Sequence, residues 1–373
     1  MDKKLGFGLM RLPLTDPNDG ASVDIELTRK MVDYFIEQGF TYFDTALMYC
    51  NGASEAAVKE ALVKRHDRSE YTVATKMHFL FFKDEADREE VFKGQLSKTG
   101  VDYFDYYLLH DIGEDSYRIY TDTHSFEWLS EKKAKGIVKQ IGFSFHDRAE
   151  LLDRVLTEHP EMDFVQLQIN YLDWDSEGVQ SRKCYETCVK HGKKVIVMEP
   201  VKGGTLANVP KRVETLFKAY DESMSIPSWA IRFAAGLDNV MMVLSGMGNM
   251  EMVRDNVSYM KDFRPLNEEE KQMCLKAASI INEGIEIPCT GCAYCVEGCP
   301  KKIAIPKYFS LYNTEKLEYE GKDFTPQGGY YNRLTQVFGK ASDCIGCKKC
   351  EKICPQHLPI TDNLKKVAKT FEG

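Results

Sequence analysis

Two runs of cysteines near the C-terminal end of the chain share one spacing, C-x2-C-x2-C-x3-C-P. The runs are Cys289, Cys292, Cys295 and Cys299 before Pro300, and Cys344, Cys347, Cys350 and Cys354 before Pro355. Three closely spaced thiolates suit one corner of a 4Fe–4S cluster, and the fourth, proline-flanked cysteine commonly ligates the other cluster. We therefore predict two clusters, one held by Cys289, Cys292, Cys295 and Cys354, the other by Cys344, Cys347, Cys350 and Cys299.

Two other chemistries fit these cysteines less well. Structural zinc usually pairs two C-x2-C units and does not use a third cysteine two residues further on. Disulfides are disfavoured in a reducing compartment. Residues 300–343 separate the runs and include the helical pattern PKYFSLYNTEKL. This arrangement is similar to helical dicluster ferredoxin domains, whose usual role is one-electron transfer.

A second group of chemically active residues lies at the ends of apolar runs. Asp44, Lys76 and His110 each end such a run, and Tyr49 follows closely after Asp44. Together these groups suit carbonyl reduction, in which hydride attack places negative charge on an oxygen that must also receive a proton. A tyrosine can donate that proton, a nearby lysine is expected to lower its pKa, an aspartate to hold the lysine, and a histidine to orient the carbonyl.

These residues need a scaffold that brings consecutive strand ends together. Eight short apolar runs alternate with amphipathic segments of helical spacing, and the runs are 5–10, 42–49, 71–78, 104–110, 140–146, 163–170, 194–200 and 240–246. Buried strands joined by helical crossovers are typical of parallel sheets. Eight such units predict a (β/α)8 barrel, an α/β fold whose active site lies at the C-terminal ends of the strands. An open doubly wound sheet is the alternative, but no G-x-G-x-x-G follows an early strand.

The β/α alternation stops near residue 264. We therefore expect a barrel over residues 1–264, and a linker helix with a small, mainly helical ferredoxin-type domain over residues 265–373. Outside the two cysteine runs, Cys274 and the helically spaced Cys184 and Cys188 are interpreted as buried packing residues.

Composition narrows the class of protein. The chain has 373 residues, of which 43% are hydrophobic and 28% charged, and its net charge is −8. These values indicate a globular protein, and the negative charge disfavours nucleic-acid binding. We see no secretory signal peptide and no apolar run long enough to cross a membrane. The expected location is cytoplasmic.

The sequence resembles the aldo/keto reductase family through the segments FDTALMYCNGASEAAVKEAL, VATKMH, YYLLHDI and GFSFH. The match extends from residue 5 to about residue 260. The resemblance implies that Asp44, Tyr49, Lys76 and His110 form the family's catalytic tetrad. It also implies an NADPH or NADH cofactor and a small carbonyl or alcohol substrate. With its cysteine-rich end, the whole chain resembles the subgroup that carries a C-terminal ferredoxin-type domain with two 4Fe–4S clusters.

The resemblance also implies a set of cofactor contacts. Ser144 and Gln166 match residues that contact the nicotinamide amide, and Met198 stands where many members have a stacking aromatic residue. The remaining expected contacts are Gly8, Met10, Ser245, Gly246, Arg254, Asp255 and Asn256. The sequence departs from the family pattern at Phe145, where an Asn is usual, and at Met252, which aligns with an arginine that often binds the 2′-phosphate. These departures leave NADPH and NADH both open.

Three functions are consistent with these patterns. The first is an NAD(P)H-dependent carbonyl reductase or alcohol dehydrogenase in which Tyr49 is the general acid/base. The second is a cluster-coupled redox enzyme that exchanges electrons with a partner protein or acts through a radical step on the substrate. The third is a non-enzymatic sensing or assembly subunit, against which the intact tetrad argues.

Overall fold

The computed structural model describes residues 3–176, 179–318 and 327–373. Eight parallel strands form a closed barrel in sequence order, which confirms the predicted fold class. The strands are β1 (Leu5–Gly8), β2 (Tyr42–Asp44), β3 (Thr72–His78), β4 (Phe104–Ile112), β5 (Val138–Phe145), β6 (Phe164–Gln168), β7 (Lys194–Met198) and β8 (Val240–Gly246). β8 pairs with β1 through Leu5 and Val243, and this pairing closes the cylinder.

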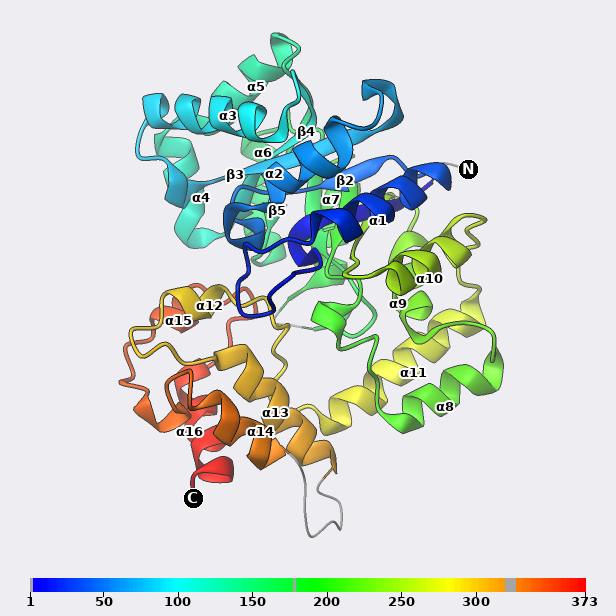
Figure 1. Cartoon of the computed structure of the whole chain (residues 1–373), viewed down its shortest axis with the longest axis vertical. Coiled ribbons are helices and arrows are strands. Elements are labelled where there is room, and N and C mark those ends of the chain that lie inside the picture. Colours follow the sequence, from blue (N-terminus) through cyan, green and yellow to red (C-terminus); the bar gives the residue numbers. More distant parts are fainter. Residues whose placement is uncertain (1–2, 177–178, 319–326) are drawn as a thin grey trace.

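Helices surround the barrel (Figure 1). They are α1 (Ile25–Glu37), α2 (Ser54–Val58), α3 (Glu85–Thr99), α4 (Glu114–Asp122), α5 (Ser125–Ala134), α6 (Ala149–Glu158), α7 (Ser181–Lys190), α8 (Lys211–Tyr220), α9 (Ile226–Ala235) and α10 (Met250–Met260). Their apolar faces and the outward-facing strand residues share one large core. Cys184 and Cys188 are buried in this core, as the helical spacing predicted.

The barrel interior is filled by side chains from six strands, as in other barrels of this size. They are Tyr42, Ala74, Leu108, Phe164, Ile196 and Leu244. The wall is tight where β5 meets β6, because a Cβ added to Gly142 would lie 2.4 Å from the carbonyl oxygen of Phe164. The interior is therefore a packed core, and only the ends of the strands are free to build a site.

After the barrel, α11 (Glu268–Gly284) packs against α8 and α9. Its buried residues, which include Cys274 and Ile281, share a core with Phe217 and Trp229. Asn267 caps the helix by accepting a hydrogen bond from the backbone N–H of Glu270. α11 thus joins the outer layer of the barrel, while the expected boundary at residue 264 remains a prediction.

The rest of the chain forms a small helical domain. It contains α12 (Tyr294–Glu297), α13 (Ile305–Glu318), α14 (Gln327–Leu334), α15 (Lys349–Lys352) and α16 (Ile360–Phe371). This domain has its own core, to which Cys295, Cys350 and Cys354 contribute. In Figure 1 the short helices α12 and α15 lie on the side of the domain that faces the barrel.

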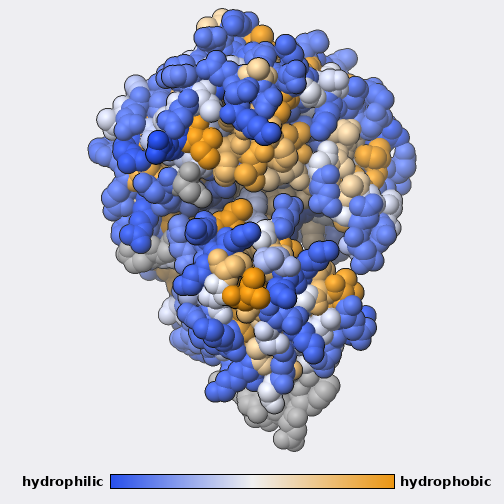
Figure 2. Space-filling model, turned by 90° about the vertical axis from the view of Figure 1, so that its left-hand side faces the viewer, coloured by the Kyte–Doolittle hydropathy of each residue, from blue (hydrophilic) through white to orange (hydrophobic). Residues whose placement is uncertain are grey.

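The surface agrees with the charged composition. Figure 2 shows a face that is largely hydrophilic apart from groups of apolar residues, the largest of them on the barrel. None of the helices in the described ranges combines the length and the apolar character that a bilayer crossing requires.

Candidate active site

The four residues of the predicted tetrad meet at the C-terminal ends of β2, β3 and β4. Lys76 Nζ donates hydrogen bonds to Asp44 Oδ1 and to the carbonyl oxygen of Thr45, the latter at 2.9 Å. The same Nζ lies 4.7 Å from the centre of the Tyr49 ring. The Tyr49 and His110 rings are 6.1 Å apart, centre to centre, and nearly perpendicular. The structure therefore brings together all four residues that the sequence singled out.

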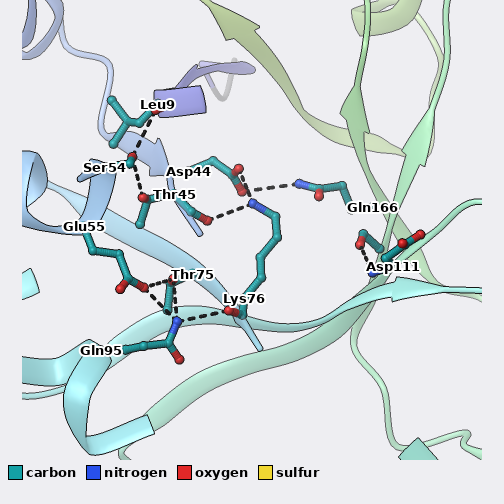
Figure 3. Close-up of polar contacts among 11 residues, drawn as sticks. Leu9, Asp44, Thr45, Ser54, Glu55, Thr75, Lys76, Gln95, Asp111 and Gln166 are labelled. Atoms are coloured by element: carbon teal, nitrogen blue, oxygen red, sulfur yellow. Dashed lines mark hydrogen bonds and ion pairs between the residues drawn. The ribbon is translucent and has the colours of Figure 1, made fainter. Parts of the chain in front are cut away.

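Asp44 and Lys76 form a buried ion pair. Asp44 is 2% exposed and Lys76 is completely buried. Burial raises the pKa of Asp44 and lowers the pKa of Lys76, and the attraction between the two charges opposes both shifts. Gln166 Nε2 donates to Asp44 Oδ2 at 3.3 Å, so the second carboxylate oxygen also has a partner (Figure 3). Both carboxylate oxygens of Asp44 therefore accept a hydrogen bond.

A network behind the pair connects neighbouring strands (Figure 3). Gln95 of α3 donates to the carbonyl oxygen of Lys76 at 3.0 Å and to Glu55 Oε1 at 2.7 Å. The hydroxyls of Thr45 and Ser54 are 2.7 Å apart, and Ser54 donates to the carbonyl oxygen of Leu9. These bonds connect the ends of the first three strands to α2 and α3, and they hold the backbone under Asp44 and Lys76.

His110 is buried in its neutral form. Burial and the nearby charges of His78 and Lys76 lower its pKa well below the ordinary value. Its Nδ1 is buried and has no hydrogen-bond partner within the described parts of the chain. The Tyr120 hydroxyl donates to the His110 carbonyl oxygen at 2.6 Å and holds the backbone. A neutral imidazole has one N–H, which can donate a hydrogen bond to a carbonyl oxygen without transferring a proton.

The pKa of Tyr49 differs from the expectation. The sequence predicted that Lys76 lowers it, but burial and the charges of Asp44 and Glu199 raise it well above the ordinary value. Burial is the largest cause of this rise, and the Asp44 carboxylate beside Lys76 offsets part of the charge of the lysine. Tyr49 therefore keeps its proton at neutral pH.

A cavity of about 280 Å³ extends from Asp44 and Tyr49 to the loop after β8. Eight of the ten expected cofactor contacts line it, namely Gly8, Met10, Gln166, Met198, Ser245, Gly246, Asp255 and Asn256. Ser144 does not line this cavity, and its buried hydroxyl accepts a hydrogen bond from the Asp111 N–H at 2.7 Å. Arg254 is exposed and also does not line it, whereas Met252 does.

The far end of the cavity has the features of an anion site. It lies at the start of α10, where Asn249 caps the helix by accepting from the Met252 N–H at 2.9 Å. Asn256 donates to Ser245 Oγ at 2.6 Å and accepts from the Tyr259 hydroxyl at 2.6 Å, so the loop is held in place. Free backbone N–H groups at a helix start favour phosphate groups. These residues fit the phosphate end of a dinucleotide.

Glu199 lines the cavity directly after β7 and was not among the residues predicted from the sequence. Its Oε2 is buried without a hydrogen-bond partner among the described residues, and burial raises the pKa of the carboxyl group. Glu199 also has a positive φ of 54°. The signal was present, since Glu199 is an acidic residue at the end of an apolar run, as Asp44 is.

The eight cysteines of the two runs surround two separate cavities. One is lined by Cys289, Cys292, Cys295 and Cys354, and the other by Cys299, Cys344, Cys347 and Cys350. Each cavity thus takes three thiols from one run and the proline-flanked thiol from the other, the exchange that the spacing predicted. In the described ranges no three His, Cys, Asp or Glu side chains are placed to share a single metal ion. Four thiols around a cavity fit a 4Fe–4S cluster.

Comparisons with known proteins agree with this geometry. The model of the aldo/keto reductase family matches residues 4–278, and this chain belongs to that family. The model of the 4Fe–4S dicluster domain matches residues 288–358. Both parts of the predicted resemblance are therefore confirmed.

Curated relatives cover the two parts separately. An uncharacterised oxidoreductase, YqkF of Bacillus subtilis, is 24% identical over 72% of this chain and 90% of its own length. An aldo-keto reductase of Mycolicibacterium vanbaalenii is 29% identical over 60% of this chain and 74% of its own. Subunit alpha 1 of the acetyl-CoA decarbonylase/synthase complex of Methanosarcina acetivorans is 29% identical over 21% of this chain but only 8% of its own.

Solved structures share the barrel fold. The holo form of the aldo-keto reductase AKR11C1 from Bacillus halodurans has a TM-score of 0.60 and 24% identity, covering 74% of this chain and 91% of its own. An aldo/keto reductase from Klebsiella pneumoniae, solved with NADP and acetate, has a TM-score of 0.59 and 18% identity, covering 75% and 96%. Both structures cover about three quarters of this chain.

The shifted pKa values of His110 and Tyr49 predict that neither group titrates near neutral pH. The pKa of His110 is lowered, so the imidazole stays neutral as the pH falls through its ordinary value of about 6.5. The pKa of Tyr49 is raised, so the phenol stays protonated as the pH rises to about 10. We expect neither His110 nor Tyr49 to produce an inflection in kcat/KM for carbonyl reduction between about pH 6.5 and pH 9.5, measured at saturating reduced cofactor. An inflection inside this window that is absent in His110→Asn would contradict the assignment of a neutral histidine.

Proposed function

We propose that the protein is an NAD(P)H-dependent oxidoreductase that transfers hydride between the nicotinamide and a small carbonyl or alcohol substrate. The observation that carries the proposal is one continuous cavity. Tyr49, beside the buried Asp44–Lys76 pair, lines one end of it, and the loop 245–256 lines the other end. The residues at the start of α10 would hold the phosphates of a dinucleotide, and those around Tyr49 would hold its nicotinamide.

Each residue of the tetrad has a separate task in this proposal. The nicotinamide supplies or accepts the hydride when the cofactor is bound. His110, which is neutral, donates a hydrogen bond that orients the substrate oxygen. Tyr49 donates its phenolic proton to that oxygen during reduction and takes it back during oxidation. Lys76, 4.7 Å from the ring, stabilises the phenolate left behind, and Asp44 keeps the lysine charged and in place.

The cofactor contacts follow from the cavity. Gln166, already bonded to Asp44, and Met198 at the end of β7 are proposed to contact the nicotinamide. Ser245, Gly246, Asp255 and Asn256 are proposed to hold the adenosine phosphate part. Arg254 is exposed near this end, and Met252 lines it. NADPH and NADH therefore both remain candidates.

The C-terminal domain is proposed to hold two 4Fe–4S clusters, one in each cysteine-lined cavity. Such clusters move single electrons, so we also propose an electron-transfer partner protein as a second binding partner. Thiolate-bound clusters suit a reducing compartment, and we propose the cytoplasm as the location.

The proposed role of Tyr49 predicts the behaviour of Tyr49→Phe. Removing the hydroxyl leaves no proton donor, so kcat/KM for aldehyde reduction falls by about 10²- to 10⁴-fold. The dissociation constant of NADPH changes little, because the ring remains. The measurement is anaerobic loss of NADPH absorbance, with cofactor binding followed by fluorescence. Tyr330→Phe, a change at a half-exposed tyrosine of α14, serves as the matched control. Full activity in Tyr49→Phe would refute the assignment.

Each cysteine-lined cavity takes its fourth thiol from the other run, so substitution of that cysteine is expected to affect one cluster only. Cys354→Ser removes a ligand from the cavity of Cys289, Cys292 and Cys295, and Cys299→Ser removes one from the other cavity. We expect each variant to lose one of two cluster signals in electron paramagnetic resonance. Iron then falls from about eight to about four atoms per chain. Cys274→Ser, at a buried cysteine outside both cavities, keeps both signals. Loss of the same signal in both variants would contradict the exchange.

A further inference from the structure

The two cysteine-lined cavities differ in charge. Among the described residues, the first cysteine cavity, which holds the thiols of Cys289, Cys292, Cys295 and Cys354, is lined by no charged side chain. The second cysteine cavity is lined by three lysines beside its four thiols, namely Lys301, Lys348 and Lys349. The segments that supply its cysteines, 299–307 and 340–352, carry seven lysines against two acidic residues, in a chain whose net charge is −8. Positive charge is therefore concentrated at one of the two cavities.

These lysines have few acidic partners. All three are exposed, and neither Lys301 nor Lys349 forms a hydrogen bond or ion pair through its side chain within the described ranges. Lys348 Nζ lies 3.7 Å from Glu351 Oε2, and Glu351 also accepts a hydrogen bond from the Thr361 hydroxyl at 2.6 Å. Exposed lysines without acidic partners create a positive potential that attracts an acidic surface.

The second cysteine cavity also reaches the molecular surface. Cys347 is exposed, and Ile345 beside it is 62% exposed. Figure 2 views the molecule from the side on which α15 lies in Figure 1, and on the small domain it shows a few apolar residues among hydrophilic ones. An apolar centre with a charged rim is typical of the small interfaces at which electron carriers dock.

The first cysteine cavity is less accessible. Cys295 and Cys354 are buried, and Thr290 is 3% exposed. The Thr290 carbonyl oxygen faces the loop after β7 so closely that a Cβ added to Gly203 would lie 2.1 Å from it. The barrel therefore covers the segment in which a carrier protein would have to approach this cavity.

The two cavities adjoin at one side chain. Ile305, at the start of α13, lines both of them and is 1% exposed. An electron that arrives at the second cysteine cavity is therefore one side chain away from the first. The exposed cavity is the natural point of entry for both.

We propose that Lys301, Lys348 and Lys349, together with Ile345, form the docking surface for a small acidic one-electron carrier protein. The inference rests on the proposed function, since it takes both cavities as cluster sites, and it deepens that function by giving the partner a site and a charge. The docked carrier gives up one electron and is oxidised, and the cluster of the second cavity takes that electron and is reduced. No bond is broken and no proton moves in this step.

The first experiment measures how fast an acidic carrier reduces the full-length, cluster-loaded protein. The probe is a reduced plant-type 2Fe–2S ferredoxin, an acidic protein, mixed anaerobically in a stopped-flow instrument. The double variant Lys301→Gln/Lys349→Gln lowers the second-order rate constant about tenfold at low salt, because the attraction is weaker. Salt at about 0.5 M removes most of this difference by screening. Lys93→Gln/Lys276→Gln, at exposed lysines of α3 and α11, is the matched control without effect.

A second reductant separates docking from an effect of the lysines on the cluster itself. Reduced methyl viologen is a small cation that needs no docking surface. We expect the variant Lys301→Gln/Lys349→Gln to be reduced by it as fast as the unaltered protein, or faster, because positive charge has been removed. Equal slowing with both reductants would show that the lysines act on the reduction potential, and would overturn the docking surface. An unchanged rate with ferredoxin would overturn it as well.

A third experiment identifies the cavity at which the electron enters. Cys354→Ser keeps the second cluster site, and Cys299→Ser keeps the first. In rapid-freeze electron paramagnetic resonance, we expect ferredoxin to reduce Cys354→Ser as fast as the unaltered protein and Cys299→Ser about tenfold more slowly. The reverse order would overturn the inference.

The outcomes also distinguish this inference from the function on which it rests. Two cluster signals, with a ferredoxin rate that the lysine variants leave unchanged, would overturn the docking surface and leave the proposed function standing. An unaltered protein without cluster signals would overturn the cluster sites and the docking surface together. Hydride transfer is tested separately by Tyr49→Phe.

Discussion

The buried ion pair between Asp44 and Lys76 is the interaction on which the rest of the site depends. A single charge at this depth would cost several kcal/mol, and the pair offsets that cost only while its geometry is kept. Gln166, Thr45 and the network around Gln95 supply this geometry from β6, β2 and α3. The closed barrel brings these elements to one place. The position of Lys76 beneath the Tyr49 ring is therefore a consequence of barrel closure.

The second constraint is the seam between the two domains. The segment Cys289–Cys295 contributes thiols on one side and packs on Gly203 on the other. Hydride transfer moves two electrons, whereas each cluster moves one. Proximity alone therefore does not make the clusters part of the reaction. The contact between Thr290 and Gly203 fixes the position of the first cysteine cavity relative to the loop after β7, and electron transfer to a partner is proposed as a separate capacity.

The sequence predicted the barrel because eight buried runs alternate with amphipathic helices, and this local alternation is visible in the sequence itself. It also predicted Asp44, Lys76 and His110, because polar side chains at the ends of buried strands are unusual and indicate a functional site. Glu199 obeys the same pattern and was overlooked. The contact of Thr290 with Gly203 could not be found this way, because the docking of one domain on another leaves no local periodicity. The raised pKa of Tyr49 could not be predicted from the sequence either, because it depends on burial and on the charges around the ring.

Direct hydride transfer within the barrel cavity is tested most directly by isotope transfer. The cluster-loaded protein would reduce an aldehyde with NADPH that carries deuterium on one face of nicotinamide C4. The account predicts that the deuterium from one of the two faces is recovered on the carbinol carbon of the alcohol. Alcohol without deuterium from either face, with the label released to water, would show that the electrons travel through the clusters and would contradict the account.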